Sequence, residues 1–272
     1  MRILAALFAT AAFALPAQSH EFWIEPLAYQ IGADGTVQGA LVNGENFEGA
    51  EQSYIPQRFT RFTMASGLRQ DDVENRLGAT PGLDSEPFGE GLHVVSYQSG
   101  MAIVGYSEWE KFLSFSEHKA FENIETLHDE RGLPRTDFNE GYWRFAKTLI
   151  GVGHSTGRDF RTGLAVEYVA LDNPYTDDLS NGMRVQLYVL DDLRADGQVE
   201  LFEKAPDGTV EITLHRTDEH GIATLPVKAG HSYLVDHVYL REPRPDLAAE
   251  ADIVWETLWA ALTFEVPAAD GN

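Results

Sequence analysis

The sequence predicts a mainly β fold: two closely packed Ig-like antiparallel β-sandwich lobes, with a short helical insertion in the first. Three observations lead to this fold class. Short apolar stretches alternate with turn residues along most of the chain, this alternation becomes regular after about residue 164, and a helical period occurs only over residues 107–131. The chain shows no internal repeat and no low-complexity linker, so we expect the lobes to pack against each other.

The first lobe is expected to span residues 20–163. Residues 65–91 are rich in glycine and acidic side chains and predict a long loop. The expected strands are residues 36–42 and 58–64, followed by 93–97 and 102–106 as a hairpin around Ser99 and Gly100.

The helical insertion follows this hairpin. Trp109, Phe112 and Leu113 lie at the i, i+3 and i+4 spacing of a helix, which predicts a helix over residues 107–118 with Ser107 as its N-cap. A second helical stretch over residues 120–131 is expected to stop at the glycine and proline that follow it. Residues 142–152 are apolar and fit either a helix or a strand.

The second lobe is expected to span residues 164–268. Val210, Ile212 and Leu214 alternate with polar residues, as in a half-buried strand, and short turn sequences separate the other stretches. The expected strands are residues 165–171, 184–189, 210–215, 222–227 and 232–240, with residues 253–266 ending the fold.

Composition excludes several classes of function. The 272 residues contain 20 Lys and Arg, 43 Asp and Glu and no cysteine, which gives a formal net charge of −23. Without cysteine the chain has no disulfides, thiolate metal sites or iron–sulfur clusters. The strong negative charge argues against nucleic acid or an anionic membrane surface as a partner.

The first residues predict export. Met1 and Arg2 precede an apolar run over residues 3–15, and small residues lie at Ala17 and Ser19. This is the pattern of a cleavable signal peptide, and the run is shorter than the roughly 20 apolar residues that a membrane span requires. We therefore expect a signal peptide over residues 1–19, cleavage after Ser19, a periplasmic location and no transmembrane segment in the mature chain.

Cleavage there would make His20 the first residue. An N-terminal histidine offers its α-amine and its imidazole Nδ1 to one metal ion, and a further imidazole would complete a three-nitrogen site known as a histidine brace. Such donors suit Cu, Ni or Co better than Mg or Ca.

His237 is the candidate for the further imidazole. It lies in the middle of an expected strand, on the same face as Tyr233, Val235 and Tyr239. A histidine in that setting is either a buried structural residue or a metal ligand. His118 and His128 are expected near helix ends, where positive charge is favourable, and His154 lies in a glycine-rich turn.

The chain resembles a known family at several points. The similar segments are residues 20–26 (HEFWIEP), 142–147 (YWRFAK), 163–167 (GLAVE), 217–221 (TDEHG), the strand bearing His237, and residues 255–264 (WETLWAALTF). They resemble a bacterial periplasmic family of unknown function, described as a nickel/cobalt-uptake-type component. Residues 65–91 depart from the family pattern.

The resemblance implies paired β-sandwich lobes, the second similar to carboxypeptidase-regulatory-type modules. It also implies a metal-binding pair formed by the mature first histidine and a histidine in the late strand, here His20 and His237. Glu21, Asp236 or Glu256 would then orient an imidazole from outside the ligand set.

Three functions follow from these observations. The first is a periplasmic protein that binds a divalent transition metal for uptake or homeostasis, with a membrane metal transporter as a candidate partner. The second is a copper-dependent oxidative enzyme, because a histidine brace on a β-sandwich also resembles the site of lytic polysaccharide monooxygenases. The third is a structural or adhesion module that binds no metal. No catalytic acid, base or nucleophile is evident, which favours a binding protein over an enzyme.

Overall fold

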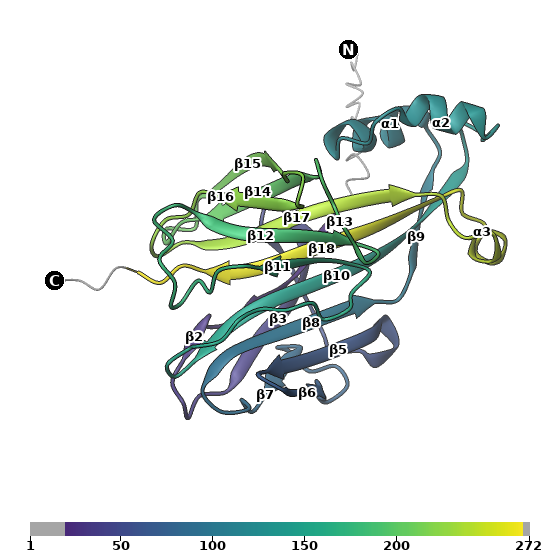
Figure 1. Ribbon diagram of the computed structural model, residues 1–272. Coiled ribbons are helices and arrows are strands. Elements are labelled where there is room, and N and C mark those ends of the chain that lie inside the picture. The colour runs from purple at the N-terminus through teal and green to yellow at the C-terminus, as the bar shows by residue number, and fades with distance from the viewer. Residues whose placement is uncertain (1–19, 269–272) are drawn as a thin grey trace, which may run out of the picture.

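The computed structural model describes residues 20–268, so the expected signal peptide and its cleavage site lie outside the described residues. These residues form a mainly β fold in which multiple, largely antiparallel sheets pack together with few helices, as predicted. A ten-stranded sheet lies between two four-stranded sheets, and the three helices lie toward one end (Figure 1). None of the helices within residues 20–268 has the length and apolar character needed to cross a membrane.

The central sheet contains strands from both halves of the chain. Its strand order is β15, β14, β17, β18, β10, β8, β5 and β6, with β2 and β9 also paired to β10. The strands are β2 (Gln30–Ile31), β5 (Phe59–Ser66), β6 (Arg69–Asp72), β8 (Gly91–Ser99), β9 (Ala102–Tyr106), β10 (Phe138–Val152), β14 (Gln198–Lys204), β15 (Val210–Arg216), β17 (Ser232–Arg241) and β18 (Trp255–Glu265).

The halves meet where β10 and β18 pair in parallel, with Glu140 opposite Trp255 and Thr148 opposite Thr263. The expected lobes therefore share one continuous sheet, although the boundary between residues 163 and 164 stays a prediction. The ambiguous residues 142–152 belong to β10, which is a strand throughout.

One four-stranded sheet covers each face of the central sheet. The first contains β1 (Glu21–Pro26), β3 (Val37–Glu45), β4 (Glu48–Gln52) and β7 (Leu83–Ser85). The second contains β11 (Val166–Ala170), β12 (Met183–Val189), β13 (Asp192–Leu193) and β16 (Ile222–Leu225).

Two apolar cores fill the spaces between the layers. Alternate residues of β17 enter different cores, since Val235 packs in the core under the second outer sheet and Leu234 packs in the core under the first. The same alternation occurs in β18, where Leu262 and Ala261 enter opposite cores. The two outer sheets are needed because both faces of the central sheet are apolar.

The helices are shorter than predicted. Helix α1 (Trp109–His118) begins after Glu108 rather than Ser107, and α2 is confined to Ile124–Glu130. Positive φ angles of 55° at Ala120 and 57° at Asn123 break the helix between them. A 3₁₀ turn (Pro56–Arg58) precedes β5, and a third helix, α3 (Pro245–Ala251), lies between β17 and β18.

Two local predictions were wrong. Strands β8 and β9 do not pair as a hairpin, because both lie antiparallel to β10, at Leu149–Val152 and at Phe138–Tyr142 respectively. Residues 65–91 are not one long loop, since β5 and β6 form a tight hairpin with Ser66 opposite Arg69 and β7 adds to the first outer sheet.

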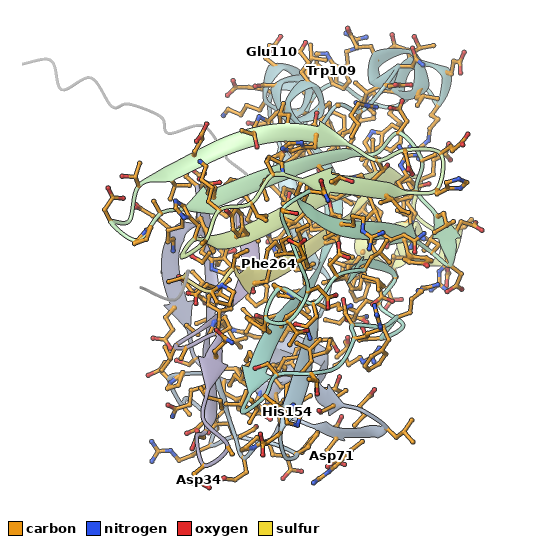
Figure 2. The ribbon with its side chains drawn as sticks, turned by 60° about the vertical axis from the view of Figure 1, so that its left-hand side comes forward. Asp34, Asp71, Trp109, Glu110, His154 and Phe264 are labelled. Carbon is orange, nitrogen blue, oxygen red and sulfur yellow. The ribbon has the colours of Figure 1, made fainter. Side chains whose placement is uncertain are left out.

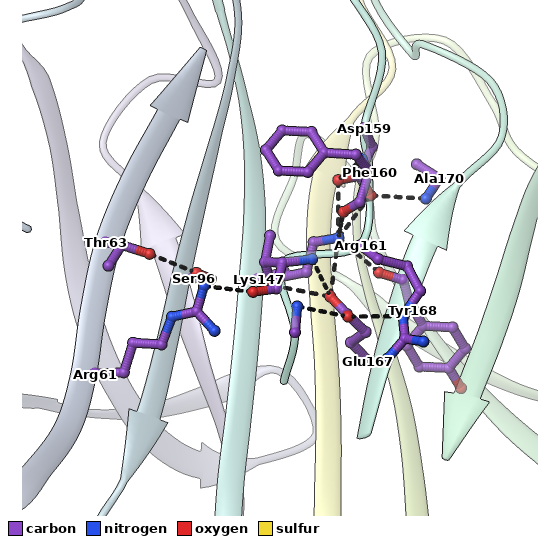
Figure 3. Close-up of polar contacts among 12 residues, drawn as sticks. Arg61, Thr63, Ser96, Lys147, Asp159, Phe160, Arg161, Glu167, Tyr168 and Ala170 are labelled. Carbon is purple, nitrogen blue, oxygen red and sulfur yellow. Dashed lines mark hydrogen bonds and ion pairs between the residues drawn. The ribbon is translucent and has the colours of Figure 1, made fainter. Parts of the chain in front are cut away.

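A buried ionic cluster attaches the chain before β11 to the central sheet (Figure 3). Lys147 on β10 donates to Asp159 at 2.9 Å and lies 3.7 Å from Glu167. Glu167 also accepts hydrogen bonds from the backbone of Thr162 and Gly163. The lysine is 1% exposed, so its charge depends on these carboxylates rather than on water.

Replacing Lys147 by methionine should strongly destabilise the fold. The substitution keeps the side-chain volume but leaves the carboxylate of Asp159 buried without its cation and Glu167 with Arg161 alone, and breaking a buried ion pair typically costs about 3–5 kcal/mol. Urea unfolding followed by circular dichroism measures this loss. Lys228→Met is the matched control, because Lys228 pairs with Glu203 at an exposed position and its loss should not shift the midpoint. Equal midpoints for the two variants would contradict the prediction.

Candidate functional site

His20 lies at the start of the first outer sheet. It directly precedes β1, where Glu21 pairs with Gly44 of β3. Its Nδ1 atom is 3.0 Å from Oε1 of Glu45, and half of its side chain is exposed. Pairing of β1 with β3 therefore holds this histidine against the end of β3.

A cavity of about 430 Å³ opens beside His20. It lies between the starts of β1 and β14 on one side and helix α1 on the other. Its acidic lining residues are Glu21, Glu45, Glu110 and Glu200, and its basic ones are Lys111, His118 and Lys119. Figure 2 shows Glu110 with α1 at one end of the molecule and His154 at the opposite end, which separates His154 from this cavity.

Lys119 closes the inner end of the cavity. Its Nζ atom lies 3.4 Å from Glu21, 3.0 Å from Glu200 and 3.2 Å from Asp236. These three carboxylates form the one group among residues 20–268 in which three acidic or histidine donors come close enough to hold a metal ion, but the ammonium group lies among them. The inner end therefore already contains a cation.

Burial and charge change the pKa values of this cluster. Burial raises the pKa of Asp236 to about 7, despite the attraction of Lys119. Burial alone would lower the pKa of Lys119, but the charges of Asp236, Glu200 and Glu21 outweigh it and raise the pKa above its usual value. Lys119 thus stays protonated over the physiological range.

His118 lies on the outer side of the same cavity. It is the last residue of α1, and its Nε2 atom is 3.5 Å from Oε2 of Glu200. A hydrogen bond with Glu200 raises the pKa of His118. Burial raises the pKa of Glu200, yet the hydrogen bond with His118 and the charge of Lys119 outweigh it and lower that pKa. The imidazole is thus held at the cavity by a carboxylate.

His237, the second predicted ligand, is 5% exposed and lies away from this cavity. Its Nδ1–H donates to the carbonyl oxygen of Gln198 at 2.7 Å, and its Nε2 has no hydrogen-bond partner among the described residues. A Cβ atom at Gly197 would lie 3.4 Å from the imidazole Cε1, so the turn before β14 passes directly over the ring. Burial lowers the pKa of His237 to about 4.

The structure does not bring His20 and His237 together. Asp236 and His237 are consecutive in β17, so their side chains point to opposite faces of the central sheet. Asp236 shares Lys119 with Glu21, the neighbour of His20. His237 instead shares its face with Val235, in the core under the second outer sheet. The sheet itself separates the two histidines.

The residues expected to orient an imidazole have other partners. Glu21 and Asp236 bind Lys119, as described above. Glu256 accepts hydrogen bonds from Trp143 at 2.8 Å and Arg241 at 2.6 Å. Sequence reasoning placed His118 at a helix end but missed its contact with Glu200, because the contact joins residues 82 positions apart in sequence and no local pattern links them.

Residues 17–241 match the family described as "Domain of unknown function (DUF4198)". The chain belongs to this family. The match includes His20, His118 and His237 and ends with the last residue of β17.

No curated protein matches this DUF4198 chain. Two solved structures show weak similarity. One is the D0-D1 domain of Intimin, with 13% identity over 90% of this chain and 97% of that chain. The other is the tetra-tandem repeat in the extending region of a large adhesion protein, with 9% identity over 91% of this chain and 50% of that chain. Both have a TM-score of 0.20, which supports no argument about this chain.

The buried imidazole of this DUF4198 protein should make its stability depend on pH. Between about pH 4 and the ordinary pKa of 6.5, the unfolded chain protonates His237 while the folded chain does not. The contribution of His237 to the free energy of unfolding therefore rises with pH across this window and is constant above it.

Urea unfolding of the wild type and His237→Gln at several pH values measures this effect. Other titrating groups are common to both proteins, so the difference between their free energies of unfolding isolates the imidazole. This difference should grow in favour of the wild type from about pH 4 to 6.5, and an NMR titration should place the His237 pKa near 4. A pH-independent difference would refute the assignment.

Proposed function

We propose that the mature protein is a periplasmic binding protein whose cargo is a divalent transition metal (Cu, Ni or Co), taken up or buffered for the cell. Its ligands would be the α-amine and Nδ1 of His20 and a carboxylate oxygen of Glu45, with water in the remaining positions. The observation that carries this proposal is the 3.0 Å approach of His20 Nδ1 to Glu45 Oε1 at the mouth of an acidic cavity.

The distances suit a shared metal ion. Donors bound at about 2.1 Å lie about 3.0 Å apart in a right-angled arrangement and about 3.4 Å apart in a tetrahedral one. His20 Nδ1 and Glu45 Oε1 are 3.0 Å apart, so they have the spacing of neighbouring ligands.

The donor chemistry and charge support the same class of cargo. Amine and imidazole nitrogens with one carboxylate favour late first-row ions, and Cu²⁺ binds such donors more tightly than Ni²⁺ or Co²⁺. Four glutamates around the cavity and a net charge of −23 favour attraction of a cation. The resemblance to nickel/cobalt-uptake-type proteins supports a role in uptake, with a membrane metal transporter as the recipient.

Metal titration of the mature chain beginning at His20 tests the proposal. We expect Ni²⁺ and Cu²⁺ to bind with one-to-one stoichiometry by calorimetry at pH 7. His20→Ala and Glu45→Gln should each raise the Kd by more than the roughly 10–100-fold that loss of an outer-shell partner costs. An added glycine before His20 should weaken binding similarly, because it removes the free α-amine from the chelate.

His237→Gln and His154→Ala are the matched controls, since both remove an imidazole outside the cavity and should leave the Kd unchanged. Unaltered binding by His20→Ala would refute a terminal chelate. Loss of binding in His237→Gln would instead favour the pair of ligands that the sequence suggested.

A further inference from the structure

A second cavity of about 430 Å³ lies between the first outer sheet and the central sheet. Residues of β1, β3, β5, β8 and β10 line it, together with the turn before β5. No aspartate or glutamate lines this cavity, whereas Arg58 and Arg144 both do. It thus has the opposite charge character to the acidic cavity beside His20, in a chain whose acidic residues outnumber its basic ones by about two to one.

Arg144 is a buried cation without an anionic partner. It lies on β10 and is 7% exposed, and its Nη1 atom has no hydrogen-bond partner within residues 20–268. Its guanidinium lies over the rings of Tyr142 and Trp259, at 5.1 and 4.9 Å from their centroids. No carboxylate of the described part of the chain lies within ion-pair distance of it.

The nearby acids cannot take this role. Glu21, Asp236 and Glu140 act on Arg144 through space. The carboxylates of Glu21 and Asp236 are bound to Lys119, and that of Glu140 accepts hydrogen bonds from Tyr106 and Thr257. A buried charge is costly unless it is paired, and a guanidinium offers a planar fork of donors that matches a carboxylate. Because Arg144 lines the cavity, its guanidinium is suited to an anion that enters from outside.

The remaining wall is aromatic. Phe22 lies 4.7 Å from Tyr97, and Phe59 lies 5.5 Å from Tyr97, measured between ring centroids. All three rings line the cavity. At its rim, Arg58 donates to Gln52 at 3.3 Å and remains exposed. Flat apolar groups pack well against such rings, and the volume falls within the range of ligand pockets in proteins.

We propose that this cavity binds a small organic carboxylate with a flat apolar body. The carboxylate would pair with Arg144, with Arg58 attracting it at the rim, and the flat body would pack against Phe22, Phe59 and Tyr97. This site is independent of the metal cargo, because none of its lining residues belongs to the proposed ligand set.

Binding of 2-naphthoate to the mature chain in metal-free buffer tests this site. We expect calorimetry to give a Kd in the micromolar range, with the neutral isostere 2-naphthamide binding at least about tenfold more weakly. Arg144→Met should abolish the preference for the anion. Arg58→Gln, at an exposed position, should weaken binding of 2-naphthoate without weakening that of the amide.

Arg184→Gln is the matched control, because Arg184 is exposed on the second outer sheet and pairs with Asp172. It should bind both probes as the wild type does. If Arg144→Met does not fold, Arg58→Glu decides, since charge reversal at the rim must weaken anion binding further than Arg58→Gln. Equal binding of the two probes, or no binding of 2-naphthoate at millimolar concentration, would overturn the proposal. Neither result would bear on the metal site, because no metal is present.

Discussion

The parallel pairing of β10 with β18 is the constraint on which the rest of the architecture depends. It aligns Glu140–Thr148 with Trp255–Thr263 and so joins the two halves of the chain in one sheet. Alternate residues of β17 and β18 enter different apolar cores, so this sheet is apolar on both faces and must be covered on both. The two outer sheets provide this cover, and the buried Lys147 on β10 attaches the chain leading into the second of them.

The distribution of buried charge explains why two neighbouring cavities differ in character. Lys119 binds three carboxylates at the junction of β1, β14, β17 and α1, which leaves Arg144 without an anion, although both cations lie about 5 Å from the ring centroid of Trp259. Consecutive residues of β1 belong to different cavities, since Glu21 lines the acidic one and Phe22 the aromatic one. One short strand therefore contributes to both candidate binding sites.

Sequence reasoning predicted the fold class and many of the strands because alternation of apolar and polar residues is a local property. It failed where pairing is set by distant partners. Strands β8 and β9 look like a hairpin locally, but a common partner, β10, pairs with both. The candidate site shows the same division. His20 was proposed from the expected cleavage after Ser19, which is a local pattern, whereas the proximity of His118 to Glu200 requires the packing of α1 against β14.

His237 lies in the middle of a strand, as predicted, but not beside His20, the partner that the resemblance implied. Its place in the middle of a strand was expected, and it is buried there, but alternation puts it on the face opposite Asp236, and the sheet then lies between it and His20. The orientation of one residue in β17 thus decides which imidazole is available to the first outer sheet.

The hydrogen-bonded register of β1 has a consequence for the chain end. Glu21 is already fixed opposite Gly44, so a terminus created after Ser19 would have almost no free chain to immobilise. A flexible N-terminus would lose conformational entropy when it coordinates an ion. Here that entropy is lost earlier, during folding. The proposed metal ion would then bind to a rigid donor group. Mutations that weaken the pairing of β1 with β3 would lower the affinity for the metal without changing any ligand residue.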